Sequence, residues 1–121
     1  MRVICNIRMQ GRDPLRVTMR QFGARDEMKF NRAIRAAVAS IDESEPGSQD
    51  DAEELILDAQ MRALANRIEA AEGWSPWPDE VSERLAWLDE AGAAVIDALV
   101  SHLRPRAEKD VDLGKSLTGA T

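Results

Sequence analysis

Few residues in this sequence could do acid–base or nucleophilic chemistry. Cys5 and His102 are the only cysteine and the only histidine of the chain. A thiol and an imidazole can form a nucleophile and its general base, but they must meet in space and a third group must orient the ring. Cys5 instead fits an apolar pattern, which favours a small core side chain, and His102 fits the last turn of a helix. We therefore expect no enzymatic activity, no catalytic residues and no cofactor.

The metal-ligand patterns are incomplete as well. One cysteine and one histidine cannot supply a typical structural zinc site. An acidic stretch matches a calcium-binding loop at its positions 1, 3, 6, 9 and 12, which are Asp42, Ser44, Gly47, Asp50 and Glu53. Position 5 is Pro46, which has no side-chain oxygen. The stretch therefore favours an acidic loop followed by a helix N-terminus, and no metal site is predicted.

Four arginines near the N-terminus are candidates for binding a charged partner: Arg2, Arg8, Arg16 and Arg20. On one face of a strand pair they could track phosphates. No aromatic residues interleave with them and the formal net charge of the chain is -6, so nucleic-acid binding is disfavoured. The first 35 residues carry a net +6 and the other 86 carry -12. This asymmetry would let subunits attract each other head to tail, as a homo-oligomer, or let the basic end meet an acidic partner.

Two further groups of side chains are candidates for a protein interface. Trp74 and Trp77 bracket a Ser-Pro pair and Trp87 follows them. They fit either lids on the core or exposed anchors, because tryptophan is enriched at interface hot spots. The second group is acidic and consists of Asp50, Asp51, Glu53 and Glu54. Together with the four arginines, Trp74, Trp77 and these acidic residues form the predicted partner-binding set.

A β-hairpin is predicted to position the arginines. Apolar residues alternate with polar ones from Val3 to Met9 and again from Leu15 to Met19, the period of a half-buried strand. The segment between them, Gly11-Arg12-Asp13-Pro14, has the residues of a turn. Because an isolated hairpin is marginal in water, helices or another subunit must cover its apolar face.

Three helical patterns follow the hairpin. The first covers residues 24–41, and a polar loop over 42–51 follows it and overlaps the start of the second helix at Ser48. That second pattern is expected to run to about Glu72, and the third covers 79–103 with a kink or break near Gly92. Pro105 ends the third helix, and the polar segment 105–121 is expected to be a flexible tail.

These elements predict an α+β fold that is mostly α, with an N-terminal β-hairpin packed on a bundle of three main helices. A chain of 121 residues suits one domain, expected over 1–104, with the tail over 105–121. The single cysteine excludes an internal disulfide, and the alternating N-terminus lacks the apolar run of a signal peptide or membrane span. We expect a cytoplasmic protein with no membrane association.

The segments VTMRQFGARDEMKFNRAI and WPDEVSERLAWLDEAGAAVIDALVSHL carry a family resemblance. Together with the hairpin before them and the acidic helix between them, they resemble small tail assembly chaperones of long-tailed bacteriophages, over residues 15–103. Those proteins present a strand pair similar to V-x-V-R-x-L-T-x-R-E, matched here by Val17 to Glu27. The resemblance implies a non-enzymatic protein of the host cytoplasm that holds tape-measure or tail-tube proteins before assembly.

Two other functions stay open. The chain could be a virion component, such as a head-to-tail connector subunit whose C-terminal tail is held by its neighbours. It could also be a small acidic phage inhibitor of a bacterial defence system, such as an anti-CRISPR, that mimics nucleic acid with residues 42–58. Pull-down with tail proteins, salt-dependent DNA binding and inhibition of a defence nuclease would separate these hypotheses.

Overall fold

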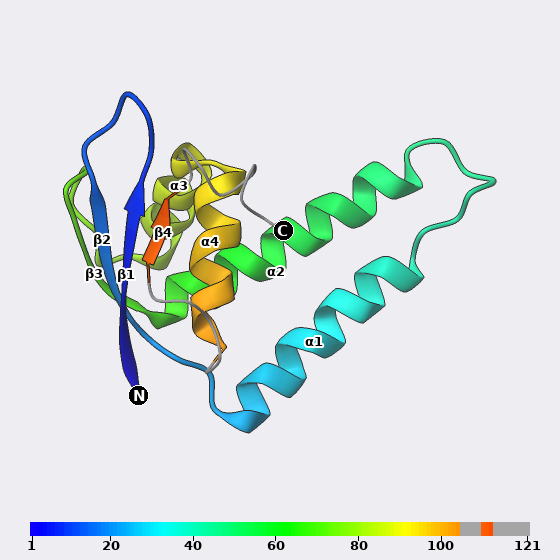
Figure 1. Ribbon diagram of the computed structural model, residues 1–121. Helices are drawn as coiled ribbons and strands as arrows, with labels where there is room; N and C mark the ends of the chain where they lie inside the picture. Colours follow the sequence, from blue (N-terminus) through cyan, green and yellow to red (C-terminus); the bar gives the residue numbers. More distant parts are fainter. Residues whose placement is uncertain (105–109, 113–121) are drawn as a thin grey trace.

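The computed structural model describes residues 1–104 and 110–112 (Figure 1). Within these residues the elements follow in the order β1 (Arg2–Arg8), β2 (Leu15–Arg20), α1 (Ala24–Ala39), α2 (Ser48–Arg67), β3 (Ile68–Glu72), α3 (Val81–Ala91), α4 (Ala93–Leu103) and β4 (Asp110–Asp112). The fold is α+β and mostly helical, as predicted.

The predicted hairpin of β1 and β2 is confirmed. The two strands are antiparallel, with Val3 opposite Met19 and Cys5 opposite Val17. β3 pairs antiparallel with β2, and β4 pairs parallel with β1, so the order of the described strands is β3-β2-β1-β4. Since successive side chains of a strand point to opposite faces, the apolar residues of the hairpin share one face and the arginines share the other.

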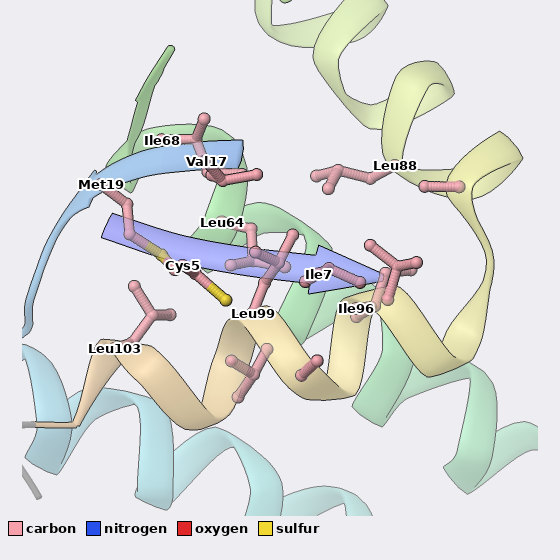
Figure 2. Packing of buried hydrophobic residues seen from close by; sticks show 14 of the residues in the cluster. Cys5, Ile7, Val17, Met19, Leu64, Ile68, Leu88, Ile96, Leu99 and Leu103 are labelled. Carbon is pink, nitrogen blue, oxygen red and sulfur yellow. The ribbon is translucent and has the colours of Figure 1, made fainter. Parts of the chain in front are cut away.

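The core lies between the apolar face of the sheet and the helices. Figure 2 shows Cys5 and Ile7 of β1 directed toward Ile96, Leu99 and Leu103 of α4, and all of these side chains are buried. Leu64 near the end of α2 and Leu88 of α3 belong to the same cluster. We refer to the sheet, α3, α4 and the buried end of α2 as the body.

The predicted end of the second helix is wrong. The helix was expected to reach Glu72, but α2 ends at Arg67 and Ile68–Glu72 form β3. Ala70 and Ala71 favour a helix in isolation, yet pairing with β2 places Ala70 opposite Thr18. Here the hydrogen bonds of the sheet override the local preference.

The predicted break in the third helix is confirmed. Gly92 has φ 99°, a value that side-chain-bearing residues rarely adopt, and it separates α3 from α4. The tail predicted over 105–121 lies outside the described residues except for 110–112, which form β4.

The first two helices form an arm on the body. α1 and α2 run antiparallel, and Figure 1 shows them extending away from the sheet, with their connecting loop at the far end. The arm consists of α1, the loop after it and α2 up to its buried end, and the principal packing partner of α1 is α2. At its base, the backbone N–H of Phe22 donates to the carbonyl oxygen of Leu103 at 2.8 Å, and the Phe22 and Phe30 rings lie 5.5 Å apart.

Candidate functional site

A groove runs between the two helices of the arm. Its volume is about 650 Å³. The floor is formed by small side chains, namely Ala33, Ala36, Ala37, Ala59 and Ala63. Phe22 and Phe30 line it at its base, and Leu55, which is 53% exposed, lines it nearer the tip. An apolar groove between two helices is a shape that receives a third helix or an extended apolar segment.

Charged side chains form the rim of this groove. Arg67 of α2 makes an ion pair with Asp26 of α1, and Arg62 Nε lies 2.8 Å from Asp58 Oδ2 one turn away on α2. The hydrogen bond from Arg67 holds the pKa of Asp26 below its ordinary value, because it favours the ionised carboxylate. The Asp26–Arg67 pair joins α1 to α2 near the body, whereas the Arg62–Asp58 pair lies within one helix.

The arm also carries exposed apolar side chains outside the groove. Met28 and Val38 of α1 are each about half exposed, at 52% and 51%, and Ile41 in the loop is exposed as well. Among the described residues outside the arm, the exposed large apolar side chains are those of Met1, Ile4 and Val81.

The four predicted arginines lie together on the outer face of the sheet. Arg2 is directly opposite Arg20, and Arg16 lies opposite Asn6 of β1. Arg8 is exposed at the end of β1 on the same face. The sequence pattern therefore located these side chains correctly, although what binds them stays a prediction.

Acidic residues of β3 accompany these arginines. Arg2 Nε donates to Glu69 Oε1 at 2.6 Å, and Glu72 is the register partner of Arg16. The hydrogen bond from Arg2 lowers the pKa of Glu69. Part of the positive charge of this face is thus balanced within the chain, which weakens it as a surface for a polyanion.

The predicted acidic residues lie at the free end of the arm. Asp50, Asp51, Glu53 and Glu54 are all exposed in the first two turns of α2. Negative side chains are favourable at this end because they complement the helix dipole. They therefore stabilise the start of α2, and they also give the tip of the arm a negative surface.

The tryptophans attach the connector between β3 and α3 to the body. Trp87 is buried, its Nε1 donates to the carbonyl oxygen of Ser75 at 2.9 Å, and its ring lies 5.2 Å from that of Trp77 in an edge-on arrangement. Trp74 Nε1 donates to the carbonyl oxygen of Asp13 at 2.7 Å, while the Arg12 guanidinium lies 3.5 Å from the centre of its ring. Trp74 and Trp77 are half-buried, so both keep some surface toward solvent while packing against their neighbours.

Cys5 and His102 meet in the core, a contact that the sequence analysis did not foresee. Cys5 Sγ lies 3.5 Å from His102 Nδ1, and neither side chain is exposed. The same Nδ1 lies 2.8 Å from the carbonyl oxygen of Ala98, one turn earlier in α4. Since a carbonyl oxygen can only accept, Nδ1 carries the proton and cannot take one from the thiol. His102 Nε2, the remaining acceptor, is buried and has no hydrogen-bond partner among the described residues.

The stretch in the calcium-loop register forms a hydrogen-bonded turn. Asp42 Oδ1 accepts from the Ser44 backbone N–H at 2.9 Å and from its hydroxyl at 2.6 Å. These bonds lower the pKa of Asp42. Ser48 Oγ closes the loop by donating to the Asp42 carbonyl oxygen at 2.7 Å. Across the described residues, no three Asp, Glu, His or Cys side chains gather as metal ligands would.

The groove is the feature that sequence reasoning missed. It depends on how α1 and α2 lie against each other, which the periodicity of either helix does not give. A signal was present in the alanines, because Ala33 with Ala36 and Ala59 with Ala63 repeat at helical spacing. A stripe of alanine on each of two successive helices allows close helix approach and leaves a shallow surface beside it.

Comparisons of the chain with protein-family models, with curated proteins and with solved structures find no match. In the described part of the chain, no helix combines the length and the apolar character that crossing a membrane requires.

Proposed function

We propose that this protein is not an enzyme and acts by associating with other proteins through its helical arm. The observation that carries the proposal is the groove with its alanine floor on an element that projects from the body. Burying apolar surface contributes about 25 cal/mol per Å², so a partner that covers this groove and the exposed Leu55 gains binding free energy without remodelling the body.

The specific role that we propose is that of a tail assembly chaperone, which holds tape-measure or tail-tube proteins before they assemble. Its support is the sequence resemblance over residues 15–103 together with the apolar groove. An assembly chaperone must cover apolar surfaces of its client until the client's own neighbours do so. A projecting arm with an uncovered groove is suited to that task.

A pull-down experiment tests this function. The chain would be co-expressed with tape-measure and tail-tube proteins and recovered by an affinity tag. We expect a tail protein to be recovered with the wild type and lost with Leu55→Asp, because an aspartate at the rim of the groove places a charge where an apolar contact is needed. Val81→Asp is the matched control, because Val81 is 48% exposed in the body and should leave recovery unchanged.

The outcome that contradicts the chaperone role is recovery of no tail protein with folded wild type. Equal recovery with Leu55→Asp would instead place the binding surface outside the arm.

A second candidate is an acidic inhibitor of a bacterial defence system, favoured by the negative tip of the arm. Asp50, Asp51, Glu53 and Glu54 are exposed together there, and such a surface can occupy a site built for nucleic acid. Stoichiometric inhibition of a defence nuclease that disappears when these four residues are changed to lysine would support this role. An unchanged nuclease rate would exclude it for that nuclease.

A further inference from the structure

A second hollow lies along α2, beside the groove between α1 and α2. Its volume is about 610 Å³, and the described residues that line it all belong to α2. Three of them are acidic and three are apolar, namely Asp51, Glu54 and Asp58, and Leu55, Leu57 and Met61. Leu55 and Asp58 also line the groove, so the two features adjoin. We refer to this second feature as the α2 hollow.

The apolar side chains of the α2 hollow keep part of their surface in solvent. Leu57 and Met61 are one helical turn apart; both pack against the core cluster, yet neither is fully buried. Leu55 is 53% exposed. A methionine side chain is unbranched and adapts its shape to what packs on it. A partner that covers the hollow therefore gains contacts with three apolar side chains.

The start of the helix does not account for the acidic side chains of the α2 hollow. Asp51 lies in the first turn of α2, where the helix dipole favours a carboxylate, but this effect is confined to that turn. Glu54 and Asp58 are the seventh and eleventh residues of the helix. Because residues three and four apart are neighbours on a helix, these three carboxylates repel one another. A cationic partner would relieve that repulsion.

The chain itself neutralises little of this negative charge. From Ser48 to Met61, α2 has five acidic side chains and no basic one. Asp58 Oδ2 lies 2.8 Å from Arg62 Nε, and both side chains are more than half exposed. Asp51 and Glu54 are exposed and make no ion pair with any described residue. The hollow is therefore complementary in charge to lysine and arginine side chains.

We propose that the α2 hollow binds an amphipathic helix of a partner protein, with lysine or arginine beside leucine-like residues on the face that meets α2. The apolar residues of that helix cover Leu57 and Met61, and its cations meet Glu54 and Asp58. A helix fits because the lining residues repeat at helical spacing, which a helix lying alongside can match turn by turn. Nucleic acid is disfavoured, because its phosphates would face the carboxylates. This inference rests on the proposed association through the arm and adds the chemistry of a partner.

Fluorescence anisotropy with a designed peptide tests the proposal. The probe is a fluorescein-labelled helical peptide in which leucines form one face and lysines flank them, and it is titrated with the full chain. We expect saturable binding that weakens as added salt screens the charges. The same peptide with glutamate in place of every lysine should not bind, because like charges then face each other.

Two adjacent glutamates of α2 provide a matched pair of variants. Glu54 lines the hollow and Glu53 does not, while both are exposed. Glu54→Lys should weaken binding of the lysine peptide about tenfold or more, because it places a cation against the cations of the peptide. Glu53→Lys makes the same change in net charge and should weaken binding no more than about twofold, through screened long-range repulsion.

A third variant addresses the apolar contact. Met61→Ala removes most of one apolar side chain of the hollow and should weaken peptide binding about fivefold. Circular dichroism and thermal unfolding of each variant check that the arm is folded. Because Glu54 is exposed and Met61 is partly buried, Glu54→Lys keeps the test decisive if Met61→Ala unfolds.

Three results would overturn the proposal: no binding of the lysine peptide to the folded wild type at low salt, equal binding of the glutamate peptide, or equal weakening by Glu54→Lys and Glu53→Lys. Sedimentation velocity of the chain without peptide examines a second copy as the occupant. Self-association that Glu54→Lys abolishes would assign the hollow to that second copy and would also overturn the proposal.

The pull-down with tail proteins separates this inference from the proposed function. If the lysine peptide does not bind and a tail protein is still recovered, the partner of the α2 hollow is refuted and the chaperone role is kept. If the peptide binds as expected and no tail protein is recovered, the chaperone role is refuted and this inference is kept.

Discussion

The body and the arm use their apolar residues in opposite ways. In the body, Leu99 and Leu103 of α4 are fully buried against the sheet, and Leu88 of α3 closes the same core. On the arm, Val38 of α1 and Leu55 of α2 are each more than half exposed. The difference teaches that Leu99 and Leu103 stabilise the fold, whereas Val38 and Leu55 remain available for a partner.

The largest expected contrast is between two truncations to alanine. Leu99→Ala should lower the free energy of unfolding by about 2–5 kcal/mol, because it leaves a cavity in the core. Val38→Ala should change it by no more than about 0.5 kcal/mol, since Val38 is already half in water. Urea denaturation of the dilute protein measures both values. Equal losses would show that the arm is packed as tightly as the body.

A smaller contrast is expected between two glycines with positive φ. Gly73, with φ +106°, ends β3, and a Cβ there would run into the backbone carbonyl of Pro14. Gly47, with φ +88°, lies in the loop of the arm and has open space around it. Gly47→Ala should cost about 1 kcal/mol of stability from backbone strain alone. Gly73→Ala should cost about 3 kcal/mol or more, because the turn of the hairpin must also move. Thermal or urea unfolding measures the stability lost in each variant. Equal losses would mean that the hairpin turn moves aside at little cost.

Hydrogen exchange should distinguish the two regions without any substitution. Amides of α1 are expected to exchange by local opening, and those of α4 only by opening of the whole body, because α4 is packed between the sheet and α2. We expect α1 to exchange at least about tenfold faster in dilute protein, a difference of 1.4 kcal/mol in opening free energy. Uniform exchange would contradict the division into two regions.

The smallest expected effect concerns pH at the base of the arm. Arg67 lowers the pKa of Asp26 in the folded protein, so the ion pair stabilises the fold above the ordinary aspartate range, near pH 4. This contribution is lost as pH falls through the lower pKa of the folded state. We therefore expect Asp26→Asn to be less stable than the wild type at neutral pH and the gap to close in acid. Unfolding free energies measured against pH for the wild type, Asp26→Asn, Arg67→Gln and the double variant give the interaction energy of the Asp26–Arg67 pair. A stability difference between the wild type and Asp26→Asn that does not change with pH would contradict this prediction.

Much of the fold could be predicted because its signals are local. Alternation from Val3 to Met9 and from Leu15 to Met19 predicted the hairpin and placed the arginines on one face. The helical periods and Gly92 gave the helices and the break between α3 and α4. β3 was missed because Ala70 and Ala71 carry no strand signal of their own, and the strand exists only through its pairing with β2.

The candidate site was less accessible to sequence reasoning because it depends on contacts between distant residues. The contact of Cys5 with His102 spans 97 residues. Its signal was that His102 follows Leu99 by three residues and Val95 by seven, which places the ring on the core side of the helix. The groove likewise needs the placement of α1 against α2, for which the alanine stripe of each helix was only a separate indication.

The junction at the base of the arm has a mechanical consequence. α2 is one uninterrupted rod of 20 residues, about 30 Å long. Most residues of its first two turns are exposed, whereas Leu64 and Ala65 near its end are buried. β3 begins at Ile68, directly after Arg67, so no linker is present in which the rod could swivel. A sideways pull on the tip therefore acts as a torque on β3 and on β2, with which β3 pairs.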